Sequence, residues 1–98
     1  MAQPIYKVFM GKYTEAWYQR SKEEQDDIFA KNMAAFERLG GKWVLVCDSL
    51  WASDQWHFWG VAEFPDLESI QKYTEVMVEL KWFRYLDGIS VLGTALPT

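Results

Sequence analysis

Two residues with acid–base chemistry, Asp48 and His57, lie close together in the segment CDSLWASDQWHFWG (residues 47–60). The segment also contains the only cysteine of the chain, and its histidine is the only one. A carboxylate that holds an imidazole in one tautomer gives a general base that works near neutral pH. Such a base removes a proton from a phenol or from a carbon next to a carbonyl. The residue types therefore predict a catalytic pair in which His57 is the base and Asp48 orients it.

A β-hairpin would bring the two side chains together. The runs KWVLVCDSLW (residues 42–51) and WHFWGVAEF (residues 56–64) are rich in β-branched and aromatic residues. The polar tetrapeptide ASDQ separates them and is typical of a hairpin connection. We therefore expect two antiparallel strands joined by a short turn.

The register of this hairpin decides whether the catalytic pair can form. If Trp51 pairs with Trp56, then Asp48 pairs with Trp59 and is a diagonal neighbour of His57, about 7 Å away at Cβ. That distance is within reach of a hydrogen bond between carboxylate and imidazole, and Trp59 then lies beside the base as a substrate-binding residue. The alternative is that Asp48 and His57 only satisfy each other's hydrogen bonds at the mouth of a barrel or at a subunit interface.

The segment KYTEAWYQRS (residues 12–21) is a second candidate for function. It is long for a connection between a strand and a helix, and aromatic loops of this kind often carry function. One hypothesis is that it folds over a pocket as a lid, with Trp17 and Arg20 binding substrate. The other is that Trp17 covers the core and Arg20 pairs with a nearby acid. Cys47 is interpreted as a small buried apolar residue.

The remaining elements complete a βαββαβ order. Ser21 and Glu24 have the spacing of a capping box at the start of a helix, and Asp66 is suited to cap a second helix. The elements predicted besides the hairpin are strands at residues 4–12 and 89–96, a helix at 22–39, and a helix from 66 that ends within 81–88. This order is the split-βαβ or ferredoxin-like arrangement.

The two hairpin strands barely alternate between apolar and polar residues. In WVLV and HFWGVA nearly every residue is apolar, which indicates strands that are covered on both faces. Two helices cover only one face of a four-stranded sheet, so the other face needs a second sheet, most simply from an identical chain. The pattern therefore predicts a homodimer.

Length, charge and composition exclude several classes of function. The 98 residues suit a single domain over residues 1–98, and the net charge of −4 argues against nucleic acid as a partner. No segment has the pattern of a signal peptide or of a membrane span, so we expect a cytoplasmic protein with no membrane partner. One Cys and one His do not make a Cys/His zinc set, and neither a metal site nor a cofactor is predicted.

The order of elements, the length, the two-sided strands and the junction VAEFPDLESIQKY (residues 61–73) together resemble the dimeric α/β-barrel superfamily. This superfamily includes antibiotic-biosynthesis-type monooxygenases and muconolactone-isomerase-like and EthD-like proteins. The stretch AWYQRSKEEQDDIF (residues 16–29) is most similar to small darcynin-like members. The resemblance implies an α+β, ferredoxin-like fold: a four-stranded antiparallel sheet with two helices on one face, which pairs as a dimeric α/β barrel.

The resemblance also has implications for the function and for the role of Tyr73. Monooxygenase-like members tend to carry a histidine on the second helix near the position of Tyr73, so a haem ligand is not implied there, and Tyr73 is interpreted as substrate-binding. The first hypothesis is a small-molecule-binding, cofactor-independent enzyme, monooxygenase-like or isomerase-like, that acts on a flat aromatic or quinone-like substrate. The alternative is a non-catalytic dimeric binding or structural module, because members of one fold do unrelated jobs.

Overall fold

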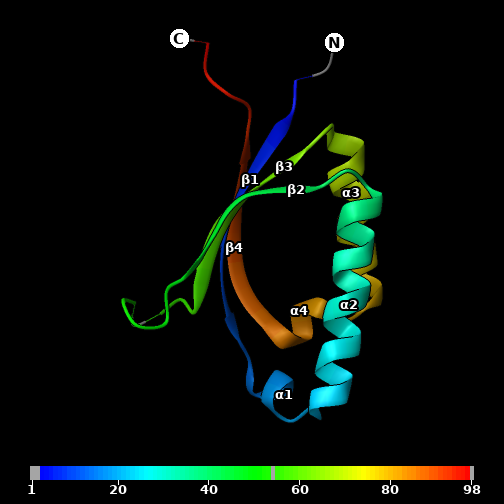
Figure 1. Cartoon of the computed structure of the whole chain (residues 1–98), viewed down its shortest axis with the longest axis vertical. Coiled ribbons are helices and arrows are strands. Elements are labelled where there is room, and N and C mark those ends of the chain that lie inside the picture. Colours follow the sequence, from blue (N-terminus) through cyan, green and yellow to red (C-terminus); the bar gives the residue numbers. More distant parts are fainter. Residues whose placement is uncertain (1–2, 54, 98) are drawn as a thin grey trace.

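A four-stranded sheet with helices on one of its faces makes up the fold (Figure 1). The computed structural model describes residues 3–53 and 55–97. In chain order the elements are β1 (Ile5–Tyr13), α1 (Glu15–Tyr18), α2 (Lys22–Arg38), β2 (Lys42–Asp48), β3 (Phe58–Phe64), α3 (Leu67–Glu79), α4 (Trp82–Tyr85) and β4 (Leu86–Gly93). The helices α1 and α4 are single turns that flank the two long helices in the sequence.

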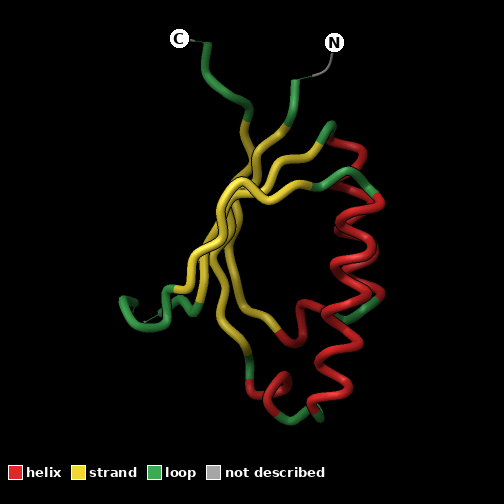
Figure 2. The backbone as a smooth tube through the Cα atoms, viewed as in Figure 1, coloured by secondary structure: helices red, strands yellow, loops and turns green. Residues whose placement is uncertain are grey.

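The sheet has the strand order β2-β3-β1-β4, and every neighbouring pair is antiparallel. The long helices α2 and α3 lie side by side across one face of the sheet, and the other face carries no helix (Figures 1 and 2). This is the α+β, ferredoxin-like arrangement with two long helices on one face, so the predicted fold class is confirmed.

Helix α2 begins and ends where the sequence predicts. The Ser21 hydroxyl accepts a hydrogen bond from the Glu24 backbone N–H at 3.1 Å, and the Glu24 carboxylate accepts one from the Ser21 N–H at 3.4 Å. Gly40 follows the helix with a φ of 84°, a left-handed conformation that glycine adopts without strain. The capping box and the terminal glycine therefore set the length of α2.

The second long helix is shorter than predicted. Helix α3 ends at Glu79, and Lys81 then adopts the left-handed conformation with a φ of 59°. This turn redirects the chain, so that Trp82 and Tyr85 of α4 are buried in the core. Strand β4 follows at once from Leu86, three residues before the predicted start, because burial of these two aromatic side chains competes with continuation of the helix.

The register of the β2–β3 hairpin differs from the prediction. Asp48 pairs with Phe58 and not with Trp59, and the pairing shifts by one residue between Trp43 and Leu45. The connection between the strands spans residues 49–57 and is longer than the predicted tetrapeptide. The predicted pairing of Trp51 with Trp56 is therefore wrong, since both residues lie within this connection.

Hydrogen bonds of the connection explain its length. The Ser49 carbonyl accepts from the N–H groups of Ala52 and Ser53, and the Asp48 carboxylate accepts from the Leu50 N–H at 3.1 Å. These bonds turn the chain immediately after Asp48, because a carboxylate that bonds the N–H two residues later closes a turn. Trp51, at the tip, is 84% exposed.

The core lies between the sheet and the helices. Its fully buried members are mainly aromatic and come from both helices, from β3 and from the two single-turn helices. The buried apolar residues are Trp17, Ala35, Phe36, Ala62, Phe64, Ile70, Tyr73, Met77, Trp82 and Tyr85. The Phe36 ring stacks on that of Trp43 at a centroid distance of 4.2 Å and contacts that of Phe64 edge-on at 5.3 Å. Aromatic contacts therefore pack α2 against the sheet.

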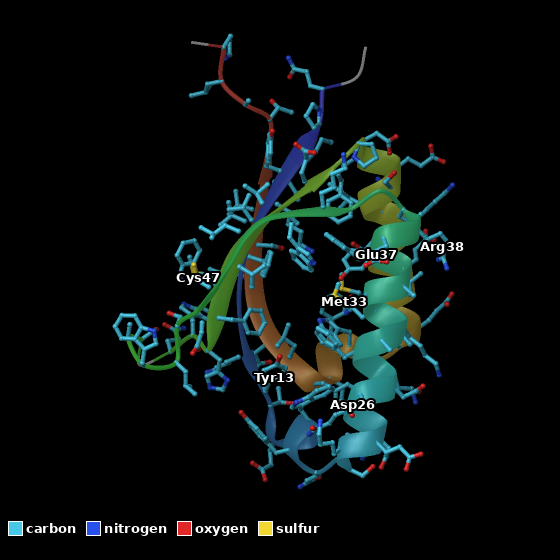
Figure 3. The ribbon with its side chains drawn as sticks, in the orientation of Figure 1. Tyr13, Asp26, Met33, Glu37, Arg38 and Cys47 are labelled. Atoms are coloured by element: carbon cyan, nitrogen blue, oxygen red, sulfur yellow. The ribbon has the colours of Figure 1, made fainter. Side chains whose placement is uncertain are left out.

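The central part of the opposite face of the sheet is apolar and open. Val8 pairs with Val61 and Val91, which places the three side chains in one row across β3, β1 and β4. Val91 is 67% exposed and Val8 is 38% exposed. Figure 3 shows Cys47 on this side of the sheet, away from the helices. We call this surface, formed by Val8, Met10, Leu45, Cys47, Trp59, Val61, Ile89 and Val91, the outer face.

Candidate functional site

A cavity of about 770 Å³ lies between the sheet and the helices. Residues of β1, β2, β3 and β4 border it on one side, and residues of α1, α2, α3 and α4 border it on the other. Figure 3 shows Met33 of α2 pointing toward the sheet and Tyr13 at the end of β1, one on each side of this space. The aromatic residues that line it are Phe9, Tyr13, Trp17, Tyr18, Phe29, Phe36, Trp43, Phe58, Phe64, Tyr73, Trp82 and Phe83.

Besides Tyr18 and Ser90, six polar side chains of the lining fall into two groups. Lys7, Asn32 and Tyr73 form the first, and Tyr13, Asp48 and His57 form the second. Lys7 and Tyr13 are six residues apart on the same strand, which corresponds to about 20 Å along β1. The two groups therefore lie toward different ends of the cavity.

His57 is held by backbone groups of neighbouring strands. The N–H of Tyr13 donates to Nδ1 of His57 at 3.2 Å, and the N–H of His57 donates to the carbonyl of Gly11 at 2.9 Å. An N–H donor at Nδ1 requires a lone pair there, so the proton of the neutral imidazole lies on Nε2. In this arrangement His57 offers an N–H donor to a ligand.

Asp48 and His57 both line the cavity, but they do not form the predicted pair. The Asp48 carboxylate is bonded to the N–H of Leu50, and His57 is bonded to Tyr13. Within residues 3–53 and 55–97, no hydrogen bond or ion pair joins Asp48 to His57. The predicted contact is wrong because the hairpin register moves Asp48 opposite Phe58. The catalytic roles of the two residues stay predictions.

Tyr73 and Asn32 form a buried pair between the two long helices. The Tyr73 hydroxyl donates a hydrogen bond to Oδ1 of Asn32, and their relative exposures are 7% and 3%. Burial raises the pKa of the Tyr73 hydroxyl to about 12. Tyr73 therefore stays neutral across the physiological pH range and contributes a dipole and a ring face to the cavity.

Lys7 reaches over the ring of Tyr73. Its ammonium lies 5.8 Å from the ring centroid, in the range of a cation–π contact. Burial lowers the pKa of the Lys7 ammonium, because the charged form loses contact with water. Sequence reasoning identified Tyr73 but missed Lys7 and Asn32. The available signal was the position of Lys7, which alternates with Ile5 and Phe9 on the inward side of β1.

The other predicted site residues are divided between core and surface. Trp17 is buried, lines the cavity and stacks on Tyr13 at a centroid distance of 5.3 Å. Arg20 does not border the cavity and, from the connection between α1 and α2, pairs with Glu24 at 3.4 Å. Trp59 lies on the outer face, where it pairs with Cys47, and does not border this cavity. The segment proposed as a lid is partly strand β1 and partly helix α1.

The described part of the chain has neither a metal-binding cluster nor a helix able to span a membrane. No group of three or more His, Cys, Asp or Glu side chains in it is placed to hold a metal ion. None of its helices combines the length and the apolar character needed to cross a membrane.

Comparison with known proteins shows similarity to solved structures. No protein-family model matches the chain, and no curated protein does. A protein of unknown function from Rhodopseudomonas palustris is 19% identical with a TM-score of 0.71, over 100% of this chain and 86% of that one. SnoaB, a cofactor-independent oxygenase from Streptomyces nogalater, is 17% identical with a TM-score of 0.57, over 99% of this chain and 97% of that one.

A third similar structure is a mutant chlorite dismutase from Candidatus Nitrospira defluvii. It is 15% identical with a TM-score of 0.74, and the match covers 100% of this chain but only 43% of the dismutase chain. At these identities the comparisons establish the fold. The predicted resemblance to dimeric α/β-barrel proteins is confirmed at that level.

Proposed function

We propose that the chain is a small-molecule-binding protein that holds a flat, largely apolar ligand in the cavity between the sheet and the helices. The observation that carries this proposal is the cavity itself, at about 770 Å³. Sites for small organic ligands usually measure about 300–1,000 Å³ and are lined by apolar and aromatic side chains with a few polar groups.

The chemistry of the lining favours an aromatic ligand. Phe9, Trp17 and Phe58 present wide apolar surfaces, and aromatic rings pack against such surfaces by offset stacking or edge-on contact. Polar groups occur at a few positions, which suits a ligand with few polar substituents. A quinone-like or phenolic molecule has this distribution of apolar and polar surface.

We further propose that the ligand is a substrate, turned over by a cofactor-independent, monooxygenase-like or isomerase-like reaction. SnoaB, which has a similar fold, is described as a cofactor-independent oxygenase, and this supports the reaction class. In such a reaction the Nε2–H of His57 would donate a hydrogen bond to a ligand oxygen, and Asp48 would contribute negative charge at the same end of the cavity.

A specific observation favours the alternative of a non-catalytic binding module. The Nδ1 lone pair of His57 is occupied by the Tyr13 N–H, and the Asp48 carboxylate is occupied by the Leu50 N–H. The imidazole then has no free basic nitrogen for proton abstraction, and one of the two Asp48 carboxylate oxygens is already bonded. Under this alternative, the two residues fix the ends of β1 and β2 and the cavity binds its ligand without reaction.

We propose that two copies pair through the outer face to form a homodimer. The supporting observation is the row of exposed aliphatic side chains that includes Val8, Ile89 and Val91. Exposed apolar patches of this kind are typical of interaction surfaces, and a sheet face is covered most simply by the same face of a second copy. The cytoplasmic location and the single domain over residues 1–98 stay predictions.

A thermal-shift screen against phenols, quinones, lactones and haem tests the binding proposal. A ligand that binds only the folded chain raises its melting temperature. Ser90 is exposed and borders the cavity from the inner face of β4, so Ser90→Trp should fill part of the space and abolish the shift. Glu75→Trp on the exposed side of α3 is the matched control and should retain it.

An activity assay on each compound that binds then separates enzyme from binding module. Turnover that is lost in His57→Ala while binding is retained would support the enzyme. Binding without turnover by the wild-type chain would support the module, and an equal shift for Ser90→Trp and wild type would contradict the cavity as the binding site.

A further inference from the structure

Resting on the proposed binding function, we propose that Lys7 makes the cavity selective for aromatic ligands that carry an anionic oxygen, a carboxylate or a phenolate. The inference concerns the substrate class and rests on the polar group at the Tyr73 end of the cavity. That group lies apart from Asp48 and His57, to which sequence reasoning assigned the chemistry.

Lys7 lies among apolar residues on the face of the sheet that packs against the helices. Its neighbours across the sheet are Ala62 on β3 and Leu92 on β4, and neither has a side-chain acceptor. The flanking inward positions on the same strand are Ile5 and Phe9. Burial of an ammonium in such surroundings costs free energy unless an opposite charge or a hydrogen-bond acceptor is present. A bound ligand with an anionic oxygen would offset this cost for Lys7.

The part of the chain that the structure describes supplies no carboxylate to Lys7. Its four ion pairs are all between residues four apart in the sequence, and none involves Lys7. Asp48 is the one acidic residue among the described residues that line the cavity. It pairs with Phe58 while Lys7 pairs with Ala62, which places the two about 13 Å apart along the strand direction. The Asp48 carboxylate is also bonded to the Leu50 N–H.

Asn32 supplies a second donor at the same end of the cavity. Its Oδ1 accepts the hydroxyl proton of Tyr73, and none of the hydrogen bonds among the described residues uses its amide nitrogen. Asn32 is 3% exposed and borders the cavity. Lys7 lies over the Tyr73 ring and Asn32 lies at its hydroxyl, so both donors adjoin the same side chain. A ligand oxygen near Tyr73 therefore meets a positive charge and an N–H donor.

The neutral state of Tyr73 makes this end suitable for an anion. Because burial raises its pKa to about 12, the phenol does not ionise at neutral pH and places no negative charge beside the ligand. The positive charge of Lys7 is then uncompensated within the described lining of that end. A charge-assisted hydrogen bond in a partly desolvated site is stronger than the neutral bond that an uncharged analogue makes.

Two probes of nearly equal shape test the inference. 2-Naphthoate carries the anionic oxygens, and 2-naphthamide replaces them with an uncharged amide. We expect the wild-type chain to bind the naphthoate at least about tenfold more tightly near pH 7.5, measured by calorimetric titration. Lys7→Met should reduce this ratio to about one while it changes the affinity for the naphthamide less than about threefold.

Lys72→Met is the matched control because it removes the same charge next to Tyr73 in sequence, from an exposed pair with Glu68 on α3. It should keep the wild-type preference. If Lys7→Met does not fold, as judged by circular dichroism, Lys7→Gln serves the same comparison with a polar, uncharged side chain.

The outcomes separate the inference from the function on which it rests. If the wild-type chain binds both probes equally, or if both Lys7 variants keep the preference, the inference is wrong and binding of the naphthamide still supports the cavity. If neither probe binds, the proposed binding function is overturned together with the inference. A preference that disappears in Lys72→Met as well would show a general effect of net charge and would also overturn the role of Lys7.

Discussion

Replacement of Tyr73 by phenylalanine has an effect on stability that should change with pH. At neutral pH the substitution removes the hydroxyl that donates to Oδ1 of Asn32 and leaves that buried oxygen without its partner. An unsatisfied buried acceptor of this kind costs about 1–3 kcal/mol. Tyr73→Phe should therefore be less stable than the wild type by that amount near pH 7.

The wild-type chain loses this advantage at alkaline pH. A free tyrosine has a pKa near 10, whereas burial raises that of Tyr73 to about 12. At about pH 11 the phenol of Tyr73 is about nine-tenths ionised in the unfolded chain and about one-tenth ionised in the folded chain, a difference of about 1.4 kcal/mol in favour of unfolding. The sign follows because the unfolded state binds fewer protons there, so stability falls as pH rises through 10 toward 12.

The assay is urea unfolding of both proteins near pH 8 and near pH 11, followed by circular dichroism. The difference between the two proteins isolates Tyr73, because other alkaline titrations are common to both. We expect the free-energy difference to shrink by about 1.4 kcal/mol between the two pH values. A difference that stays constant would refute the reasoning, because it would mean that Tyr73 has an ordinary pKa and is not buried as described.

Three further predictions follow from the fold. Val91→Ser should raise the dissociation constant of the proposed dimer about thirtyfold, as measured by sedimentation equilibrium. Each Val91 is 67% exposed in the single chain, and burial of the two copies contributes about 2 kcal/mol. An unchanged dissociation constant would exclude Val91 from the interface. Ser21→Ala should lower the free energy of unfolding by about 1 kcal/mol through loss of the capping box, while an exposed control, Gln71→Ala, should not. Trp17→Ala should lower it by about 3–5 kcal/mol, because Trp17 is buried among aromatic rings, and a small loss would instead support the lid hypothesis.

Local signals predicted the order and ends of several elements correctly. Ser21 and Glu24 marked the start of α2, because capping depends on a few adjacent residues. The lack of alternation in strands β2 and β3 predicted that both faces of the sheet are covered. The helices cover one face, and the outer face is open in the single chain, so its cover by a second copy stays a prediction. Asp66 caps α3 as predicted, through its hydrogen bond from the Ser69 N–H.

The candidate site was harder to predict because it depends on register. A shift of one residue between Trp43 and Leu45 and the turn bonds after Asp48 changed which side chains share a face. In the observed register Asp48 lies opposite Phe58, and Asp48 and His57 bond to other partners, so the predicted partnership failed although both residues border the cavity. This outcome depends on hydrogen bonds between distant segments, such as Tyr13 with His57, which no local pattern encodes.

Lys7 and Asn32 were missed for a related reason. Each looks unremarkable in its own segment, a lysine in a strand and an asparagine in an acidic helix. Their significance arises only when β1 and α2 place both of them beside Tyr73 of α3. Tyr73, by contrast, was identified, because its position on the second helix could be compared with a known family.

The most direct test of the account is to locate a bound aromatic probe by nuclear magnetic resonance. Intermolecular NOEs from 2-naphthamide to the side-chain methyl groups of the chain report which face it occupies. Met33 and Met77 border the cavity, whereas Val8 and Val91 lie on the outer face. The account predicts NOEs to the methyl groups of Met33 and Met77 and none to those of Val8 and Val91. NOEs to the valines without any to the methionines would contradict it, because the ligand would then lie outside the cavity.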